Sequence, residues 1–413
     1  MDTRTRMLSL LHTRRRNYSL PQPFYNDAEF FALDLEYIFR RQWLFAGLAC
    51  EIPKPGHYFT MEVGPDSLII VRDRELRIHA LYNTCRHRGS RICLSERGAS
   101  AKLVCPYHQW TYELDGRLLF AGNMGEDFDP RRFHLKRAHC EVIAGYIFVC
   151  LAEEAPDFED FRRTVAPYMA PHDLDNCKVA FESTLIEQAN WKLVIENNRE
   201  CYHCAGSHPE LLNTLSEFDS TDDPRVDPAF AQRIEQKARD WDALGLPNRV
   251  IHAPDNRYRV VRLPFAHGVS MTLDGQPGCN RLLGQLRDRD LGSLRLLSLP
   301  NSWNHLQSDH ALAFRVLPIG PQQTAVTTKW LVHKDAVEGV DYDVERLTRV
   351  WLATNEQDRK LAEDNQRGIN SKAYEPGPYS PAIEFGVQNF IDWYSSEMLR
   401  QLSGETERMR VVA

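Results

Sequence analysis

The pattern of hydrophobic and polar residues changes twice along the chain and predicts three regions. In residues 1–42, "NDAEFFALDLEYIFRRQW" follows a proline-containing lead and predicts a helix capped by Asn26 or Asp27. In residues 43–155, short runs such as "SLIIVRD", "RIHALYNT" and "GYIFVCL" predict β-strands between turns. In residues 156–413, strand-like runs such as "VAFESTLIEQANWKLVIE" and "TAVTTKWLVHKD" alternate with helical ones. We therefore expect a helical segment packed on a larger α+β domain, with a small β-rich domain between them in sequence.

Composition limits the classes of protein to consider. Hydrophobic residues make up 43% of the 413 positions and charged residues 26%, as in ordinary globular proteins, and this length predicts two domains. The net charge of −7 argues against nucleic acid as a main partner, because phosphate binding needs a basic surface. No run of residues approaches the apolar length of a membrane span. We expect a small molecule or another protein as the partner.

The basic N-terminus and the cysteines bear on the compartment. The start, "TRTRMLSLLHTRRRNYSLPQPFY", lacks the apolar run that would follow the arginines in a secretory signal. We expect the twin arginines to form a solvated arm, with an Arg-rich transit peptide as the weaker alternative. Ten cysteines scattered over the chain do not form a disulfide framework. These features predict a cytoplasmic protein.

Two cysteine–histidine pairs lie in the β-rich region. They are Cys85-x-His87 and Cys105-x-x-His108, with seventeen residues between the pairs. Structural zinc sites usually group their ligands by residue type, whereas each pair here mixes a thiolate with an imidazole. In a Rieske [2Fe–2S] centre, two Cys bind one iron and two His bind the other. The spacing favours a Rieske cluster, with a zinc knuckle or incidental surface residues as the alternatives.

The residues around these pairs narrow the type of cluster. Respiratory-chain Rieske proteins resemble the pattern but carry an extra Cys near each ligand pair. The corresponding positions here hold Ser90 and Tyr107, so the oxygenase type fits better. Cys93 is interpreted as a packed thiol.

A Rieske cluster moves one electron at a time, so a second reactive centre is expected. In "ENNRECYHCAGSHPEL", His203 and His208 lie five positions apart, with Gly206 between them. This predicts a helix that distorts or ends so that both imidazoles face one ion. Two His and one carboxylate are typical ligands of non-haem Fe(II) that activates O₂. A zinc site using Cys201 and Cys204 is the weaker alternative.

The helical pattern "DVERLTRVWLATNEQDRKLAEDNQ" offers the carboxylate. Its apolar stripe contains Leu347, Trp351 and Leu361, and Asp358 lies within the stripe. A carboxylate on an apolar face is costly unless it is paired or binds a metal, so Asp358 is the predicted third ligand. A salt bridge between Asp358 and a core arginine is the alternative. The remaining acids are predicted off the stripe, namely Glu345, Glu356, Glu363 and Asp364.

Glu200 precedes His203 by three residues, so on a helix both would share one face. A carboxylate there could accept a hydrogen bond from the ring N–H of a ligand histidine. A solvated glutamate is the alternative.

Together these residues resemble the α subunits of the Rieske non-haem iron oxygenases, over nearly the whole chain. The subgroup most similar removes N-methyl groups from quaternary ammonium compounds. The matching stretches include "YSLPQPFYND", "CRHRGSRIC", "YHQWTYELDGRLLFAG", "NWKLVIENNRECYHC" and "YEPGPYS". The resemblance implies an α+β fold with a small all-β Rieske domain. It also implies a larger catalytic domain whose central antiparallel sheet is flanked by helices, of the helix-grip (START-like) type.

The resemblance also implies roles for individual residues. The [2Fe–2S] ligands would be Cys85, His87, Cys105 and His108, and the ligands of one mononuclear Fe(II) would be His203, His208 and Asp358. Glu200 matches an acid that joins a cluster histidine of one subunit to an iron-ligand histidine of its neighbour in a head-to-tail homotrimer. Asn197 matches an asparagine near the iron, although its spacing differs by one residue. Glu200 in place of Asp and Gln109 in place of Gly argue against an aromatic-ring substrate.

The implied reaction uses O₂ and electrons from a separate flavin- and iron–sulfur-containing NAD(P)H reductase, since this chain has no nicotinamide or flavin fingerprint. Hydroxylation of an N-methyl group would release formaldehyde and, from glycine betaine, dimethylglycine. Proline betaine (stachydrine), carnitine and choline are alternative substrates that spacing does not separate. A Rieske protein that only transfers electrons and a zinc-organised binding protein are the alternatives from other classes.

Candidate residues for the substrate are aromatic or can donate hydrogen bonds. Aromatic faces bind a trimethylammonium group, and the possible walls are Trp303, Tyr202, Phe314 and Phe265. The substrate carboxylate needs a donor, for which the candidates are His305, His310 and Asn304.

Overall fold

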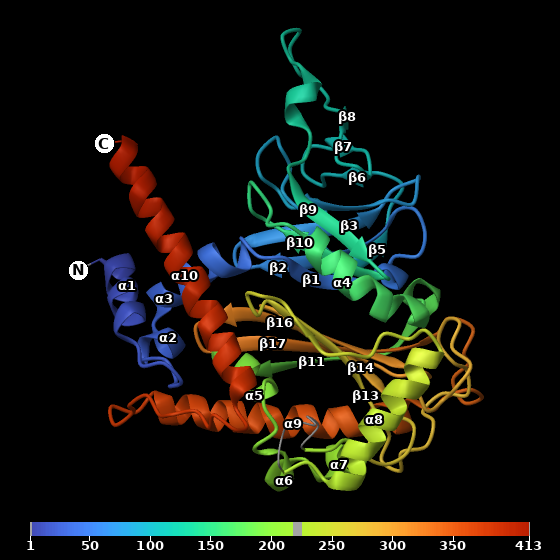
Figure 1. The fold of residues 1–413 in the computed structure, drawn as a ribbon. Helices are drawn as coiled ribbons and strands as arrows, with labels where there is room; N and C mark the ends of the chain where they lie inside the picture. The colour runs from blue at the N-terminus through green and yellow to red at the C-terminus, as the bar shows by residue number, and fades with distance from the viewer. Residues whose placement is uncertain (1, 218–224, 413) are drawn as a thin grey trace. The chain divides into compact units, whose positions relative to one another are not determined.

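The computed structural model describes residues 2–217 and 225–412, with side chains as far as residue 404. The chain divides into two units, Phe39–Phe158 and a second unit made of Met1–Ile38 with Glu159–Ala413. Figure 1 shows the course of the chain through both. No helix in the described ranges is both long and apolar enough to cross a membrane.

The unit Phe39–Phe158 consists mainly of antiparallel strands. Its larger sheet has the order β1-β10-β9-β4-β3-β2-β5, and a small sheet has the order β6-β7-β8. The larger sheet contains β1 (Leu44–Leu48), β2 (His57–Val63), β3 (Asp66–Arg72), β4 (Ile78–Tyr82), β5 (Arg97–Ala99), β9 (Arg137–Ile143) and β10 (Tyr146–Cys150). The small sheet contains β6 (Leu103–Val104), β7 (Thr111–Tyr112) and β8 (Leu118–Phe120).

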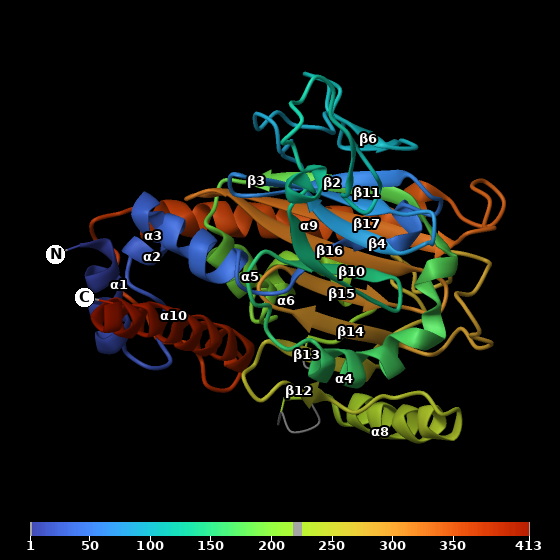
Figure 2. The same ribbon diagram turned by 90° about the horizontal axis from the view of Figure 1, so that it is seen from above.

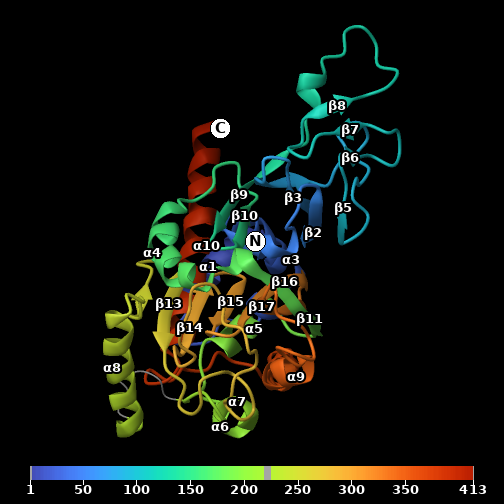
Figure 3. The same ribbon diagram turned by 90° about the vertical axis from the view of Figure 1, so that its right-hand side faces the viewer.

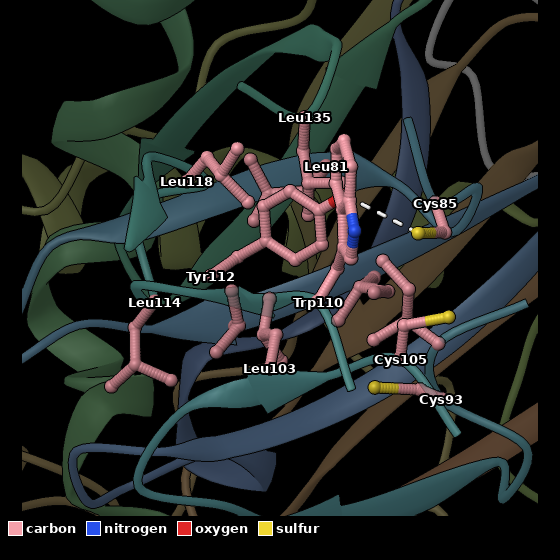
Figure 4. Packing of buried hydrophobic residues seen from close by; sticks show 13 residues of the cluster. Leu81, Cys85, Cys93, Leu103, Cys105, Trp110, Tyr112, Leu114, Leu118 and Leu135 are labelled. Carbon is pink, nitrogen blue, oxygen red and sulfur yellow. Dashed lines mark hydrogen bonds between the residues drawn. The ribbon is translucent and has the colours of Figure 1, made fainter. Parts of the chain in front are cut away.

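The core of this unit reflects the apolar runs of the sequence. Every residue of β10 is buried, and the inner positions of β3 are buried as well. A second cluster of buried side chains lies next to the small sheet and includes Trp110, Tyr112 and Leu103, together with Cys85 and Cys105 (Figure 4). The two cysteines are thus fixed in a packed environment, not on flexible surface loops.

The other unit is built on a second antiparallel sheet with the order β11-β17-β16-β15-β14-β13-β12. Its strands are β11 (Cys177–Glu187), β12 (Ile251–His252), β13 (Tyr258–Leu263), β14 (Ser293–Ser298), β15 (Ser302–Leu306), β16 (Ala311–Gly320) and β17 (Gln323–His333). The long helix α9 (Val344–Ile369) packs against β11 and against α5 (Trp191–Asn198). Figure 3 shows α9 and the short helices near it on one side of this sheet.

The remaining helices belong to the same unit. They are α1 (Thr3–Thr13), α2 (Pro23–Asn26), α3 (Ala28–Asp34), α4 (Glu159–Met169), α6 (Cys204–Ser207), α7 (Pro209–Leu212), α8 (Pro228–Ala243) and α10 (Phe385–Val412). The helix predicted after Asn26 begins at Ala28, and the Asp27 side chain caps it by accepting from the backbone N–H of Glu29. Further on, the backbone continues as a π-helical turn, Leu35–Phe39.

The solvated arm predicted for the N-terminal arginines holds only in part, because Arg15 and Arg16 are exposed whereas the Arg14 side chain is mostly buried. Residues Thr3–Thr13 form α1, which buries Met7 and Leu11 and lies beside α10 (Figure 2). The Arg6 guanidinium pairs with Asp27 at 2.7 Å, and Arg14 pairs with Asp392. Acidic partners far along the sequence hold these arginines, and the sequence alone does not reveal such partners.

Two further predictions need correction. The run predicted as a strand from Val179 to Glu196 is split, because Asn190 caps α5 by accepting from the backbone N–H of Lys192. Glu363, predicted off the apolar stripe of α9, is 8% exposed. Its carboxylate accepts a hydrogen bond from the backbone N–H of Gln188 and pairs with Arg359 at 3.0 Å, which compensates for its burial.

Candidate metal centres

The two loops that carry the Cys–His pairs have the same backbone hydrogen bonds. In each loop the cysteine N–H donates to a carbonyl five residues further on, and the cysteine carbonyl accepts from the N–H four residues on, at 2.8–3.0 Å. That fourth residue adopts a left-handed conformation in both loops, with φ 82° at Gly89 and 61° at Gln109. The backbone therefore shapes Cys85 and Cys105 into equivalent ligand loops.

The loops bury their thiols and expose their imidazoles. Cys85 is 3% exposed and Cys105 1%, whereas His87 and His108 are both exposed. The two imidazole rings lie 4.6 Å apart between centroids, and the His87 ring stacks on buried Trp110 at 4.9 Å. Two inner thiols and two outer imidazoles match the donor set of a Rieske cluster, with one iron inside and one near solvent.

The electrostatics of the thiols fit a metal. Burial raises the pKa of Cys85, although a hydrogen bond with the Tyr112 hydroxyl 3.3 Å away opposes the shift (Figure 4). Burial also raises the pKa of Cys93, to about 11, and this thiol lies in the core as predicted. Because a buried thiol resists ionisation, a bound cation would stabilise the thiolates of Cys85 and Cys105.

The second centre brings together side chains from two distant segments. His203 is the N-cap of α6, and His208 lies between α6 and α7, so the helix ends between the two histidines as predicted. Asp358 projects from α9, and its Oδ1 lies 3.4 Å from His203 Nε2 and 3.0 Å from His208 Nε2. His208 Nε2 is buried and makes no hydrogen bond despite that distance. Two imidazole nitrogens and one carboxylate facing a single point fit a divalent iron.

The other ring nitrogen of each histidine is held by a side chain. His203 Nδ1 lies 2.6 Å from Glu200 Oε1, and His208 Nδ1 lies 2.8 Å from Gln357 Oε1. Gln357 in turn donates to Glu210 at 3.0 Å. These bonds place the proton on Nδ1, which leaves Nε2 of both rings available to a metal.

Glu200 reaches His203 without a continuous helix. Residues 199–202 lie outside helices, and the Glu200 carboxylate also accepts from the backbone N–H of Tyr202. The contact predicted from helical spacing is therefore present, but a turn forms it. Gln357 was not predicted, although its position next to Asp358 would have justified considering it.

The charged groups around His203, His208 and Asp358 favour the binding of a cation. Burial disfavours the charged form of His203, but hydrogen bonds to Asp358 and Glu200 outweigh it and raise its pKa to about 9. Burial favours the neutral form of Asp358, but the hydrogen bonds from His203 and Asn197 and the nearby His208 ring outweigh burial and lower the pKa of this carboxyl. Asn197 Nδ2 donates to Asp358 Oδ1 at 2.6 Å, next to the predicted iron position. A metal would replace the imidazolium protons as the partner of the carboxylate.

The two cysteines beside His203 form a disulfide, Cys201–Cys204. The Cys204 sulfur lies close to both imidazoles, since the candidate ligand atoms of His203, Cys204 and His208 fall within 4.8 Å of one another. A sulfur engaged in a disulfide supplies no thiolate. The structure therefore offers no support for the alternative zinc site at these cysteines.

A cavity of about 230 Å³ adjoins His203, His208 and Asp358. Trp303, His305 and Trp351 line it, whereas Phe314 is fully buried behind them, stacked on Trp303 at 5.2 Å. Burial lowers the pKa of His305 to about 3, and the Arg295 charge contributes, so this imidazole is neutral.

Other predicted substrate residues lie elsewhere or are engaged. Tyr202 is 60% exposed and is absent from the cavity wall among the described residues, as are Phe265 and His310. Asn304 lines the cavity, but its amide donates to Ser302 Oγ at 2.8 Å. Four arginines in the wall were not predicted from the sequence, namely Arg199, Arg225, Arg259 and Arg295.

Family models match both parts of the chain. Residues 42–126 match the Rieske [2Fe-2S] domain, and residues 174–400 match the ring hydroxylating alpha subunit (catalytic domain). The two cofactors predicted from the sequence, a [2Fe–2S] cluster and a mononuclear iron, are those of these two domains.

Curated relatives match nearly the full length. The chain is 56% identical over 405 residues to the glycine betaine monooxygenase oxygenase subunit of Chromohalobacter salexigens, covering 98% of this chain and 91% of that protein. It is also 56% identical to the subunit of the same name from Pseudomonas aeruginosa strain PAO1, over 98% of this chain and 94% of that protein. Carnitine monooxygenase oxygenase subunits, for example from Escherichia coli K12, are 32% identical over 48% of the chain and 54% of that protein.

Solved structures share the fold. A quaternary ammonium Rieske monooxygenase in complex with γ-butyrobetaine superposes with a TM-score of 0.70 at 20% identity, over 95% of this chain and 98% of that one. Naphthalene 1,2-dioxygenase from Rhodococcus sp. gives a TM-score of 0.67 at 19% identity, over 96% and 98% of the two chains. The predicted fold class, an all-β Rieske domain joined to an α+β catalytic domain with an antiparallel sheet, is confirmed.

Proposed function

The chain belongs to the Rieske ring-hydroxylating oxygenase α subunits, and from this membership we propose that it is the oxygenase component of a glycine betaine monooxygenase. The observation that carries the proposal is the 56% identity, over nearly the whole chain, to oxygenase subunits of that name. Both metal centres that such a reaction needs have their donor sets in this structure.

The proposed reaction removes one methyl group from nitrogen. Glycine betaine, O₂, two electrons and two protons give dimethylglycine, formaldehyde and water. Hydroxylation of an N-methyl carbon yields a hemiaminal, which then breaks its C–N bond to release formaldehyde. The mononuclear iron supplies O₂ activation, and the cluster supplies single electrons. A separate reductase that draws electrons from NAD(P)H is the proposed partner.

The protein side chains would prepare the iron site before O₂ arrives. His203, His208 and Asp358 would hold the metal from one side, which leaves other positions open. Glu200 and Gln357 keep both rings in the tautomer that presents Nε2. Asn197 holds the Asp358 carboxylate through Oδ1. The indole rings of Trp303 and Trp351 line the adjoining cavity and would contact a trimethylammonium group.

We further propose that the assembly is a homotrimer and that electrons cross between subunits through Glu200. In support, the Glu200 side chain is 12% exposed and bonds His203, while the cluster imidazoles His87 and His108 are exposed and can be reached by another protein. A carboxylate has room for a further bond besides those to His203 and Tyr202. A cytoplasmic location is also proposed, because eight of the ten cysteines are free thiols in the described part of the chain.

A formaldehyde-release screen tests the proposed function. The purified oxygenase is combined with a surrogate reductase, NADH and a series of methylated ammonium compounds. We expect formaldehyde and dimethylglycine in equal amounts from glycine betaine, with slower release from proline betaine, carnitine and choline. Release from one of those three, with none from glycine betaine, would reassign the substrate. Oxidation of NADH without any formaldehyde would point to electron transfer alone.

A further inference from the structure

Arginines form part of the wall of the cavity beside the predicted iron ligands. Arg199, Arg225, Arg259 and Arg295 all line it. Of the acids in the lining, Glu200 bonds His203 and Asp358 faces the two histidines, which leaves Glu217 as the other acid among the described lining residues. Among the described lining residues, arginines therefore outnumber acids, four to three.

The strand register explains how two of these arginines reach the cavity. Side chains directly opposite one another on antiparallel strands lie on the same face of the sheet. Arg295 on β14 pairs with Val261 on β13 and with His305 on β15. Arg259 lies two residues before Val261 on the same strand, so its side chain shares the face. The face that presents His305 to the cavity thus also presents Arg259 and Arg295.

Arg199 lies at the C-cap of α5 and also lines the cavity. Within the described residues its guanidinium makes no hydrogen bond and no ion pair. Burial and the charge of Arg259 lower its pKa to about 9, and the same two arginines, together with burial, lower the pKa of His252. A partly buried cation without an anionic partner is costly, unless a ligand supplies the anion.

We propose that Arg199 is the anchor for the carboxylate of a zwitterionic quaternary ammonium substrate, with Arg259 and Arg295 adding positive charge on the facing strands. This inference rests on the proposed function and names the feature of the substrate that the cavity selects. The arginines repel the trimethylammonium group, which then lies against the Trp303 and Trp351 rings. Choline, which has a hydroxyl in place of the carboxylate, lacks the group that Arg199 binds.

Arg199 takes the place of the hydrogen-bond donors that were predicted from the sequence for the substrate carboxylate. His305 lines the cavity but is neutral, and the Asn304 amide is already bonded within the sheet. A guanidinium can instead donate two parallel hydrogen bonds to one carboxylate. Arg199 is therefore a specificity-determining residue for this reaction.

The test compares glycine betaine with its primary amide, which has nearly the same shape but no negative charge. Binding of each to the anaerobic enzyme, loaded with cluster and Fe(II), is measured by isothermal titration calorimetry. In Arg199→Gln we expect the Kd for glycine betaine to rise about 10- to 100-fold, as for loss of a charge-assisted hydrogen bond. The Kd for the amide should change less than about threefold. Arg199→Lys should recover part of the loss.

The matched control is Arg249→Gln, because that arginine is 77% exposed and is not among the described residues of the cavity wall. It should change neither Kd. Equal losses for glycine betaine and its amide in Arg199→Gln, or no loss for either, would overturn the proposal.

Turnover separates this proposal from the proposed function. If the unmodified enzyme releases formaldehyde only from another N-methylated carboxylate, glycine betaine is the wrong substrate. Arg199 keeps its role if Arg199→Gln then selectively weakens binding of that compound. If formaldehyde comes only from choline, both proposals fail.

Discussion

The two histidine pairs of this chain are positioned in opposite ways. His87 and His108 sit at the exposed tips of two loops whose shape is set by backbone hydrogen bonds, and buried thiols accompany them. The pair His203 and His208 is instead held by side chains, through Glu200 and Gln357 on the Nδ1 atoms. The first arrangement leaves imidazole edges open to a partner, and the second orients nitrogen atoms toward an internal cavity. The exposed pair therefore suits a centre that receives electrons from a partner, and the internal pair suits a centre where the substrate reacts.

The largest effect is expected from Asp358→Ala. Removing the carboxylate that lies beside both His203 and His208 should abolish binding of the mononuclear iron, because two neutral imidazoles alone hold Fe(II) weakly. Turnover should fall more than about 10³-fold, beyond the 10- to 100-fold loss typical for a residue that only supports a ligand. Metal analysis and the visible spectrum check this, and the cluster absorption should persist. Retained iron and activity would assign the ligand role to another acid.

His108→Cys tests the cluster side of the comparison. A thiolate in place of an imidazole makes the cluster more negative, so its potential should fall by about 250 mV or more if the cluster still assembles. Redox titration followed by EPR measures the shift. Cys93→Ala is the control, because that thiol packs in the core and should leave the signal unchanged. An unaltered spectrum in His108→Cys would show that His108 is not a ligand.

Glu200→Ala should reduce turnover without removing metal from either centre. Both centres should stay filled, since Glu200 supports His203 without being a predicted ligand. Turnover should drop about 10- to 100-fold, as for other residues that orient a metal ligand. Single-turnover reduction from a pre-reduced cluster, with the mass of the assembly measured in parallel, checks this. Glu345→Ala, at an 81% exposed side chain, is the control. Electron transfer at the parental rate in an intact trimer would disprove the bridging role.

A smaller effect is expected from Gln357→Leu. His208 would lose the partner of its Nδ1 atom, so iron affinity should fall about tenfold while the cluster is unaffected. Titration of the iron-depleted protein with Fe(II) measures the change. An unchanged affinity would mean that packing alone orients His208.

The smallest effect concerns the backbone of the cluster loops. Gln109→Gly should stabilise the protein by up to about 1 kcal/mol, because φ is 61° at a residue that carries a Cβ. Gly89→Gln should destabilise it by about 1–2 kcal/mol, for the same reason in reverse. In the described part of the chain, no atom outside Gly89 and its two neighbours in sequence lies within 4 Å of a Cβ added at Gly89, so conformation and not crowding is tested. Chemical denaturation measures the free energy of unfolding of both variants. If the two variants are equally stable, the two loops are not equivalent.

The parts of the sites that were predictable lie close together in sequence or follow a regular period. The Cys–His pairs fall within one short β-rich stretch, and Asp358 was picked out by the apolar stripe of a long helix that the structure contains as Val344–Ile369. The individual ligand assignments stay predictions, although the structure brings each proposed set together.

The parts that were not predictable depend on distant segments. Three of the four cavity arginines come from a helix end and two strands, and only the register of β13 and β14 brings Arg259 and Arg295 to one face. Glu363 was misplaced because a helical pattern shows its i,i+4 partner Arg359 but not the distant backbone N–H of Gln188, which also compensates its carboxylate. Arg14 similarly depends on Asp392, near the other end of the chain. Contacts with distant segments therefore determine whether such a charged side chain is buried and paired.

The most direct test of two iron centres in one chain is a count of metal and sulfide in the purified protein. We expect about three irons and about two acid-labile sulfides per chain, from one [2Fe–2S] cluster and one mononuclear site. Asp358→Ala should lower only the iron count, by about one, and leave the sulfide unchanged. Stoichiometric zinc without sulfide would show that the chain does not hold two iron centres.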